Sequence, residues 1–272
     1  LHDALPIWLI YVLPFYPDRI VQHAVMQVLE PIWDGLMIHN SFACRRGKGQ
    51  HRASDVCKEY AMKYEYCVQC DIAKFYPSIR HDLIKALLRK KIKDKDLLWL
   101  LDDIIDSAEG ERNVPIGNYL SQWLGNLFMN ELDTFVKQDL HVKPYVRYCD
   151  DFLFFGDDKE ALKSIADKAE IFCKDVLDLR LSKKNLFHTY QGVDFVGYRH
   201  FKSGKVLVRK RTARRIMKKL KRLPTMVNRK SVDKEKARSI VASADGWLQH
   251  ANTYNLRQVL MMWRLKGMVV GA

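Results

Sequence analysis

Apolar and polar positions in the middle of the chain follow two different periods, which indicates alternating strands and helices. The β-rich run 65–72 predicts a strand with Asp71 at its end, and the segment 80–91 predicts the helix that follows. Residues 91–114 form an expected helical insertion. Apolar residues then recur at helical spacing through 117–140, which predicts a long amphipathic helix.

Two further β-rich runs predict a hairpin with acidic residues at its tip. They span 145–149 and 152–155 and are separated only by Asp150 and Asp151, which is the spacing of a tight turn. A second amphipathic helix and a short strand are predicted at 162–176 and 179–181. The order strand, helix, helix, hairpin, helix, strand is close to a split βαβ sheet with helices on one face. Such a sheet can bring the hairpin acids to the strand end that carries Asp71.

The two flanks of this region differ from it in character. Residues 1–63 mix apolar helical stretches with a basic, glycine-containing loop at 44–51, whereas the chain beyond Gly204 is strongly basic and mostly helical. The apolar run 7–15 is far shorter than the roughly 20 residues that cross a bilayer, so we expect core packing or docking and no membrane association. Because the chain begins with Leu rather than Met, we expect a truncated or processed N-terminus.

Composition adds a partner class and a redox environment. A chain of 272 residues with 48% hydrophobic content can form one or two compact units. Its 46 Lys and Arg outnumber 32 Asp and Glu, and this favours a polyanion such as nucleic acid, although a merely solvated basic face is the alternative. Six scattered cysteines without a secretory signal indicate free thiols in a reducing cytoplasm. Cys67 and Cys70 would face opposite sides of a strand, so we do not expect zinc.

Carboxylates at Asp71 and Asp150 indicate metal-assisted chain extension. A 3′-hydroxyl must attack an α-phosphate, and two magnesium ions can stabilise both the attacking and the leaving oxygen. Magnesium prefers oxygen ligands, which carboxylates from two adjoining strand ends can supply. The alternative is that Asp150 and Asp151 are ordinary turn residues. Unpaired carboxylates against a largely apolar sheet are costly without a metal, which favours the ligand interpretation.

The segment 148–151, Tyr-Cys-Asp-Asp, resembles the Tyr-x-Asp-Asp box of reverse transcriptases. Segments similar to motif A, motif B, the primer-grip turn and a fingers motif are 71–76, 117–122, 194–198 and 41–51. The resemblance implies an α+β right-hand polymerase with fingers, a ferredoxin-like (split βαβ) palm and a helical thumb. The implied parts are fingers at 1–66, first palm part at 67–90, an inserted helical segment at 91–115, the remaining palm with primer grip at 116–203 and thumb at 204–272.

The same resemblance assigns roles around the strand ends. It implies that Asp71, Asp150 and Asp151 are catalytic and, with Ile72, form a two-metal magnesium site. Tyr76 matches an aromatic that occupies the space of a ribose 2′-hydroxyl, which favours DNA synthesis. A core tyrosine is the alternative for Tyr76.

Motif B points to a subgroup. Ile116, Gly117 and Gln122 match the form found in reverse transcriptases of diversity-generating retroelements, where others carry Gln at the first position. The phrases 41–49 and 246–250 also resemble that subgroup. The implied consequence is misincorporation opposite template adenines, because Ile116 replaces an amide near the templating base pair. Alternatively, Ile116 is only a core strand residue.

Cationic residues complete the expected site. Arg45 and Lys48, in the glycine-containing loop, suit an incoming triphosphate, with a solvated surface loop as the alternative. Lys184 is the candidate motif D lysine, although Lys183 is its neighbour. Cations crowd 205–222 without any acid, and one helical face there would follow a template–primer duplex, an RNA element or a partner protein. The residues of that face are Arg211, Arg214, Arg215, Lys218 and Arg222. Together with Gly197 of the primer-grip turn, they are the residues expected to bind template and primer.

The sequence therefore predicts an RNA-directed DNA polymerase that uses template RNA, an RNA–DNA duplex, dNTPs and Mg2+. The resemblance further implies a cytoplasmic protein of bacterial, archaeal or phage origin. It also implies adenine-mutagenic retrohoming with a small basic accessory variability protein, whose oligomeric state is left open. Two alternatives remain: a group II intron-like or phage-defence reverse transcriptase, and a catalytically silent RNA-binding module. The presence of all three acids disfavours the silent module.

Overall fold

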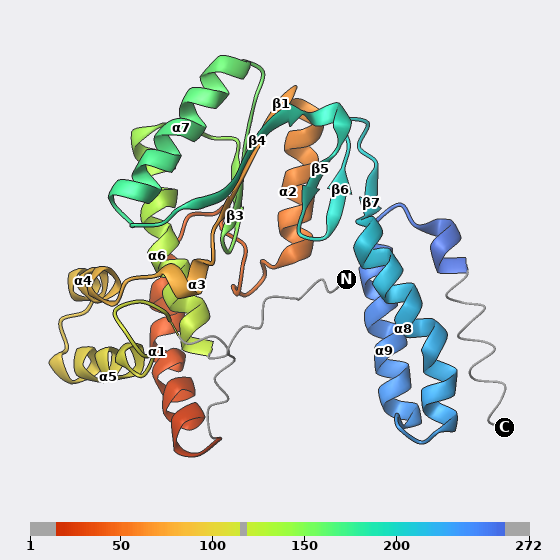
Figure 1. Cartoon of the computed structure of the whole chain (residues 1–272), viewed down its shortest axis with the longest axis horizontal. Helices are drawn as coiled ribbons and strands as arrows, with labels where there is room; N and C mark the ends of the chain where they lie inside the picture. The colour runs from red at the N-terminus through yellow and green to blue at the C-terminus, as the bar shows by residue number, and fades with distance from the viewer. Residues whose placement is uncertain (1–14, 115–118, 259–272) are drawn as a thin grey trace. The chain divides into compact units, whose positions relative to one another are not determined.

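The computed structural model describes residues 15–114 and 119–258, and the chain divides into two units (Figure 1). The first unit comprises Leu1–Ala53 and Tyr66–Phe187, and the second comprises Ser54–Glu65 and His188–Ala272. The primer-grip segment thus belongs to the same unit as the C-terminal helices. These units do not coincide with the expected fingers, palm and thumb boundaries, which stay predictions. Within the described residues, no helix is both long and apolar enough to span a membrane.

A four-stranded sheet organises the first unit. Its order is β2-β3-β1-β4, the order expected for a split βαβ palm. The strands are β1 (Tyr66–Ile72), β2 (Tyr145–Tyr148), β3 (Asp151–Gly156) and β4 (Leu181–His188). Strands β1 and β3 are antiparallel and lie between strands on both sides, so their central residues are buried, and all of them are apolar except Gln69.

Helices cover one face of this sheet, as the sequence predicted. Strand residues Val68, Cys70 and Phe154 belong to one buried core with α6 and α7, and α7 packs directly on β1 and β3 (Figure 1). The described helices that begin in this unit are α1 (Ile20–Leu36), α2 (Gln50–Lys63), α3 (Phe75–Ser78), α4 (His81–Lys91), α5 (Lys95–Asp106), α6 (Tyr119–Thr134) and α7 (Lys159–Asp175), with π-helical turns at Phe15–Arg19 and Phe135–Asp139. Cys67 and Cys70 are three positions apart on β1, so they lie on opposite faces of the sheet, as expected. Both are free thiols.

Two sequence predictions about strand limits are wrong. Tyr148 pairs with Asp151, so the two-residue turn consists of Cys149 and Asp150, and Asp151 already belongs to β3. Cys149 adopts a left-handed backbone (φ 55°), which lets the chain reverse one residue earlier than its side chains suggest. The last strand begins at Leu181 instead of occupying 179–181. It is an edge strand rich in polar residues, so it lacks the apolar pattern that predicts a strand. Leu179 is instead a buried residue of the preceding loop.

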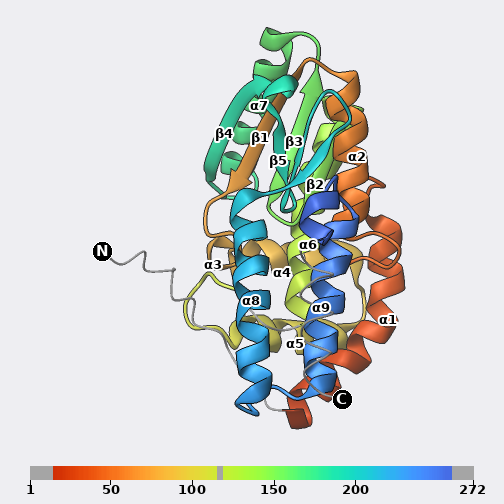
Figure 2. The same cartoon turned by 90° about the vertical axis from the view of Figure 1, so that its right-hand side faces the viewer.

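The described part of the second unit combines a small sheet with helices α8 and α9 and with most of α2. Its sheet has the order β5-β6-β7, from β5 (Val193–Phe195), β6 (Tyr198–His200) and β7 (Val206–Val208). A 3-10 turn (Thr189–Gln191) precedes β5. Helices α8 (Lys210–Asn228) and α9 (Lys234–Gln249) lie side by side (Figure 2) and bury Leu220, Leu223 and Leu248 between them. The side chain of Asp233 caps α9 by accepting a hydrogen bond from the Lys236 amide.

Candidate active site

The three candidate metal-binding acids meet at one end of the central strand pair. Asp71 of β1 lies directly opposite Asp151 of β3 in the antiparallel register. Directly opposite residues of an antiparallel pair share a face of the sheet, so both carboxylates project on the same side. Asp150 occupies the β2–β3 turn, and its carbonyl accepts a hydrogen bond from the Ile72 amide at 3.3 Å. The expected convergence of Asp71 with the hairpin is therefore confirmed at the level of the backbone.

Polar side chains from the neighbouring strands hold two of these carboxylates. The Ser182 hydroxyl of β4 donates to Asp71 Oδ2 at 2.6 Å. The Gln69 amide Nε2 donates to Asp151 Oδ1 at 3.1 Å, while Lys183 Nζ donates to Gln69 Oε1 at 2.6 Å. This chain of contacts runs from edge strand β4 through β1 to β3. It orients Asp151 through a buried amide.

The site concentrates negative charge. Burial, together with the charges of Asp71 and Asp150, raises the pKa of Asp151 to about 7 against the opposing effects of Gln69 and Lys183. Burial also raises the pKa of Asp150, to which Asp71 adds. A divalent cation would relieve this repulsion, because it favours the ionised form of every carboxylate near it.

The donor set fits a hard cation such as Mg2+, since it consists of carboxylate oxygens on adjoining backbone positions. Asp71, Asp150 and Asp151 would hold the ion. Nevertheless, residues 15–114 and 119–258 contain no group of three or more His, Cys, Asp or Glu side chains already arranged as a metal cluster. Asp71 and Asp151 instead accept hydrogen bonds from Ser182 and Gln69.

The two lysines of β4 point to different partners. Lys184 Nζ pairs with Asp167 at 2.7 Å and with Glu170, both on α7. These carboxylates raise the pKa of Lys184 and engage its ammonium group away from the acids of the strand ends. Lys183 instead reaches the amide that binds Asp151. The geometry therefore favours Lys183 over Lys184 as the lysine of this site.

Arg45 has structural partners for most of its donors. Its guanidinium binds Asp34 Oδ1 at 2.5 Å and the carbonyls of Asp34, Ile38 and Ser41, and only 6% of the side chain is exposed. These contacts anchor the loop to the end of α1 and leave little room for a triphosphate. Its role in nucleotide binding stays a prediction that this geometry does not favour.

Lys48 is more accessible than Arg45. Its ammonium donates to the His39 carbonyl at 3.0 Å and lies 5.2 Å from the Phe42 ring centroid. Burial and the nearby charge of Arg45 lower the pKa of Lys48. An ammonium group has three donors, so Lys48 keeps capacity for an anion.

Tyr76 lies on α3, the short helix that follows β1 and Asp71. Its ring approaches α6 closely, because a Cβ added to Gly125 would lie 3.0 Å from Tyr76 Cε1. Burial raises the pKa of the Tyr76 hydroxyl, so the ring stays neutral. Gln122 is exposed in the first turn of α6. Ile116 and Gly117 lie outside the described residues.

A match to a family model decides the classification. Residues 9–200, more than half of the chain, match the model described as "Reverse transcriptase (RNA-dependent DNA polymerase)". The chain belongs to the reverse transcriptase family. Protein YkfC of Escherichia coli (strain K12) is 25% identical over 85% of this chain and 69% of its own length. The group II intron-encoded protein LtrA of Lactococcus lactis subsp. cremoris is 23% identical over 68% of this chain and 43% of its own length.

Solved structures support the polymerase fold. Telomerase from Candida albicans, in complex with a fragment of telomeric RNA, has a TM-score of 0.55 at 10% identity, over 91% of this chain and 47% of that chain. Apo telomerase from Candida tropicalis, truncated from the C-terminal domain, has a TM-score of 0.54 at 15% identity over 69% of this chain and 45% of that one. The chain thus has a right-hand polymerase fold and spans less than half the length of LtrA and of these telomerases.

Further features of this reverse transcriptase lie in the second unit. Val196 and Gly197 form the two-residue β5–β6 turn, and both have positive φ (43° and 86°), as a type I′ hairpin requires. A Cβ at Gly197 would lie 2.8 Å from the Trp247 ring of α9. The expected cationic side chains of α8 are exposed, while Leu220 faces α9. Those cations are Arg211, Arg214, Arg215, Lys218 and Arg222.

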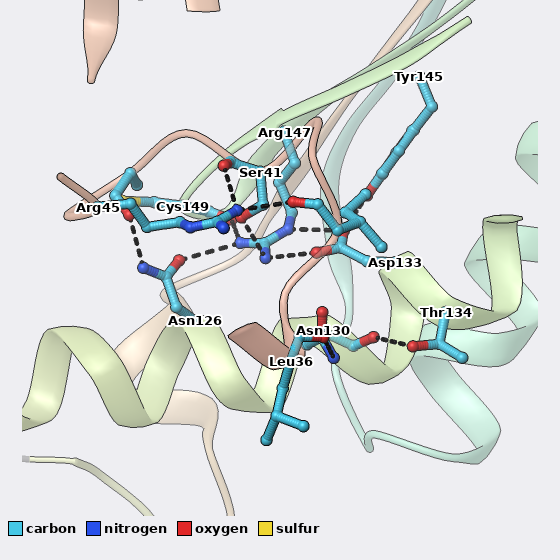
Figure 3. A network of polar contacts seen from close by, with 12 residues as sticks. Leu36, Ser41, Arg45, Asn126, Asn130, Asp133, Thr134, Tyr145, Arg147 and Cys149 are labelled. Carbon is cyan, nitrogen blue, oxygen red and sulfur yellow. Dashed lines mark hydrogen bonds and ion pairs between the residues drawn. The ribbon is translucent and has the colours of Figure 1, made fainter. Parts of the chain in front are cut away.

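Sequence reasoning missed three polar residues near the acids. Arg147 and Asp133 form an ion pair in which neither side chain is exposed, and Asn126 contacts the same guanidinium (Figure 3). One signal was present: Arg147 is a cation inside an otherwise apolar strand. Its partners could not be read from the sequence, because both lie on α6, 14 and 21 residues earlier in the chain.

Proposed function

We propose that this reverse transcriptase is an RNA-directed DNA polymerase that copies an RNA template into complementary DNA. One observation carries the proposal. Asp71 of β1 and Asp151 of β3 stand directly opposite each other on adjacent strands, with Asp150 in the β2–β3 turn. In a chain of this family, such a pair of strand ends has no simpler use than to hold cations at a growing 3′ end.

Asp71, Asp150 and Asp151 would hold magnesium, together with a backbone contribution from Ile72. When bound, two such ions stabilise the attacking and leaving oxygens of the phosphoryl transfer. The protein's own contribution is to orient the carboxylates. Hydrogen bonds from neighbouring strands to Asp71 and Asp151 support this assignment, because supporting contacts of this kind preorganise metal ligands.

Lys183 is proposed to donate a proton to the departing pyrophosphate. Its ammonium donates a hydrogen bond to the Gln69 side-chain amide, which in turn donates to Asp151. Lys184 is instead paired with two carboxylates of α7. A lysine that already binds two acids is poorly placed to protonate a third anion. The proposal therefore moves the motif D role by one residue.

Tyr76 and Lys48 are proposed to contact the incoming deoxynucleotide. The Tyr76 ring is held between α3 and α6, so it can present a fixed surface to the sugar. Lys48 retains free donor capacity for a phosphate oxygen. Arg45, Gln122, Ile116 and Gly117 are retained as nucleotide-side candidates on the resemblance alone.

The exposed cationic face of α8 is proposed to bind the template–primer duplex without base specificity. Arg211, Arg214, Arg215, Lys218 and Arg222 recur at helical spacing and are all exposed. Lys and Arg side chains that neutralise phosphates release counterions, so this binding should weaken as salt concentration rises. Gly197 belongs to the hairpin proposed as the primer grip.

We also propose the diversity-generating subtype, with adenine-mutagenic copying and an accessory variability protein. Its support is the form of motif B at Ile116 and Gly117. A group II intron-like role is the second candidate, and the similarity to LtrA favours it. Sequencing cDNA made by the wild-type protein and by Ile116→Gln separates them. Errors concentrated at template adenines, reduced in the variant, support the first candidate, whereas uniformly accurate copying supports the second.

Primer extension on an RNA template tests the main proposal. The wild-type protein should incorporate deoxynucleotides, and Asp150→Asn should abolish incorporation while RNA binding, measured by filter retention, stays intact. Asp103→Asn, which alters an exposed acid on α5, is the matched control and should retain activity. RNA binding by a wild-type protein that makes no DNA would instead support a silent RNA-binding module.

A further inference from the structure

One guanidinium in the first unit has every donor engaged. Arg147 is completely buried, and all of its N–H groups make hydrogen bonds (Figure 3). Nε and Nη2 bind the two carboxylate oxygens of Asp133 at 2.8 and 2.6 Å. This bidentate contact balances the charge of Arg147. The remaining donors therefore serve another purpose.

Those donors join three segments that are far apart in the sequence. Nη2 also binds the Ser41 hydroxyl at 2.9 Å, and Nη1 binds Asn126 Oδ1 at 3.2 Å and the Cys149 carbonyl at 2.9 Å. Ser41 precedes the glycine-containing loop, Asn126 lies on α6, and Cys149 is the first turn residue of the catalytic hairpin. Arg147 thus connects the loop, the helix and the hairpin.

Asn126 connects the same three segments from the opposite direction. Its Nδ2 donates to the Ala43 carbonyl at 2.8 Å, while its Oδ1 accepts from Arg147 Nη1. The backbone of the loop is also paired with β2, because the Phe42 amide donates to the Arg147 carbonyl at 3.1 Å. Asn126 is therefore the side chain that links the loop carbonyl to the guanidinium.

The hydrogen bond from Arg147 to the Cys149 carbonyl restrains the backbone of the β2–β3 turn. Cys149 has a left-handed backbone (φ 55°), which an L-residue other than glycine rarely adopts without support from its surroundings. The peptide group that carries this carbonyl also contains the amide of Asp150. An N–H group that fixes the carbonyl therefore fixes the start of Asp150.

We propose that Arg147 and Asn126 are positioning residues, which fix the Cys149–Asp150 turn so that the Asp150 carboxylate can share a divalent cation with Asp71. This inference rests on the proposed function, since it assigns a task to side chains that do not themselves reach the cation. Loss of a residue that orients a metal ligand typically lowers metal affinity about 10–100-fold. Asn126→Ala should therefore weaken divalent-cation binding by about tenfold.

Asn130 supplies a matched control on the same helix. It is also a buried asparagine, and its Nδ2 donates to the Leu36 carbonyl at 3.3 Å, but it makes no contact with Arg147 (Figure 3). Both Asn126→Ala and Asn130→Ala delete a buried amide and should lower thermal stability, the first more than the second because it also leaves a donor of the buried guanidinium unpaired. Only the Asn126 variant should lose metal affinity.

The measurement is a titration of the full-length protein with Mn2+, followed by electron paramagnetic resonance, alongside the Mg2+ concentration that gives half-maximal primer extension. Both midpoints should rise about tenfold in Asn126→Ala and change less than about twofold in Asn130→Ala. Equal midpoints in the two variants would overturn the inference, since the asparagine would then be an ordinary packing residue.

Arg147→Lys covers the case in which Asn126→Ala does not fold. Lysine keeps the charge opposite Asp133 but lacks the fork that reaches Asn126 and the Cys149 carbonyl together. It should show the same rise in the Mn2+ midpoint, and an unchanged midpoint would refute the assigned role. The Mn2+ titration does not require activity. A wild-type protein that binds Mn2+ but makes no DNA would refute the proposed function, and the variants would still decide the positioning role.

Discussion

The elevated pKa of Asp151 predicts that this residue destabilises the metal-free protein. Burial and the neighbouring charges of Asp71 and Asp150 raise its pKa from 3.8 to about 7. In the unfolded chain the carboxyl releases its proton near pH 4, whereas the folded protein retains the proton up to about pH 7. Stability must therefore fall as pH rises between these values, because the folded state binds more protons than the unfolded state.

The magnitude follows from the same shift. A carboxyl whose pKa rises from 3.8 to about 7 disfavours its ionised form by about 4 kcal/mol, which is an upper limit for the destabilisation at pH 8. Asp151→Asn removes the charge but keeps an oxygen that can accept the Gln69 hydrogen bond. In EDTA at pH 8, the variant should be more stable than the wild type by about 2–4 kcal/mol. Below pH 4 the difference should disappear.

Urea denaturation at a series of pH values, followed by circular dichroism, measures this difference. Asp103→Asn, which alters an exposed acid, should leave the pH profile unchanged. Magnesium should stabilise the wild-type protein more than Asp151→Asn, because only the wild type offers the full set of carboxylates. The reasoning fails if Asp151→Asn is no more stable than the wild type at pH 8, or if its advantage is the same at pH 4.

Two further predictions concern the β5–β6 turn of the second unit and the two lysines of β4. Gly197→Ala should destabilise the second unit by about 1–3 kcal/mol in thermal unfolding, because its φ is 86° and the added Cβ would lie 2.8 Å from Trp247, and unchanged stability would contradict this packing. Lys183→Met should slow single-turnover primer extension by about 100-fold, as expected for a lost proton donor, with little effect from Lys184→Met. The reverse order of effects would restore Lys184 to the motif D role.

Most of the palm could be predicted from local sequence patterns. Strand β1, the hairpin, α6 and α7 each show in their own residues, as β-rich apolar runs or as apolar positions at helical spacing, and these signals depend only on neighbours within the same segment. The Asp-Asp pair after an apolar strand, together with Asp71, indicated the chemistry for the same reason. An isolated carboxylate is costly beside buried strands, so its presence there already implies a use.

Local patterns failed where a residue's environment came from another segment. Strand β4 is polar because it lies at the sheet edge, and the order of strands is not visible in its own residues. The choice between Lys183 and Lys184 depends on which face of the sheet carries Gln69 and the acids and which carries α7. The turn was displaced by one residue because a left-handed Cys149 was not foreseen.

The sequence by itself therefore determined the order of the palm elements, because that order follows from short-range periodicity. Its resemblance to reverse transcriptase motifs indicated the family and the three acids. Only the tertiary structure decided how the acids are supported. The contacts of Arg147 with Ser41, Asn126 and Asp133 join residues up to 106 positions apart. Their geometry is set by the packing of α6 against the sheet and the loop, which no local pattern encodes.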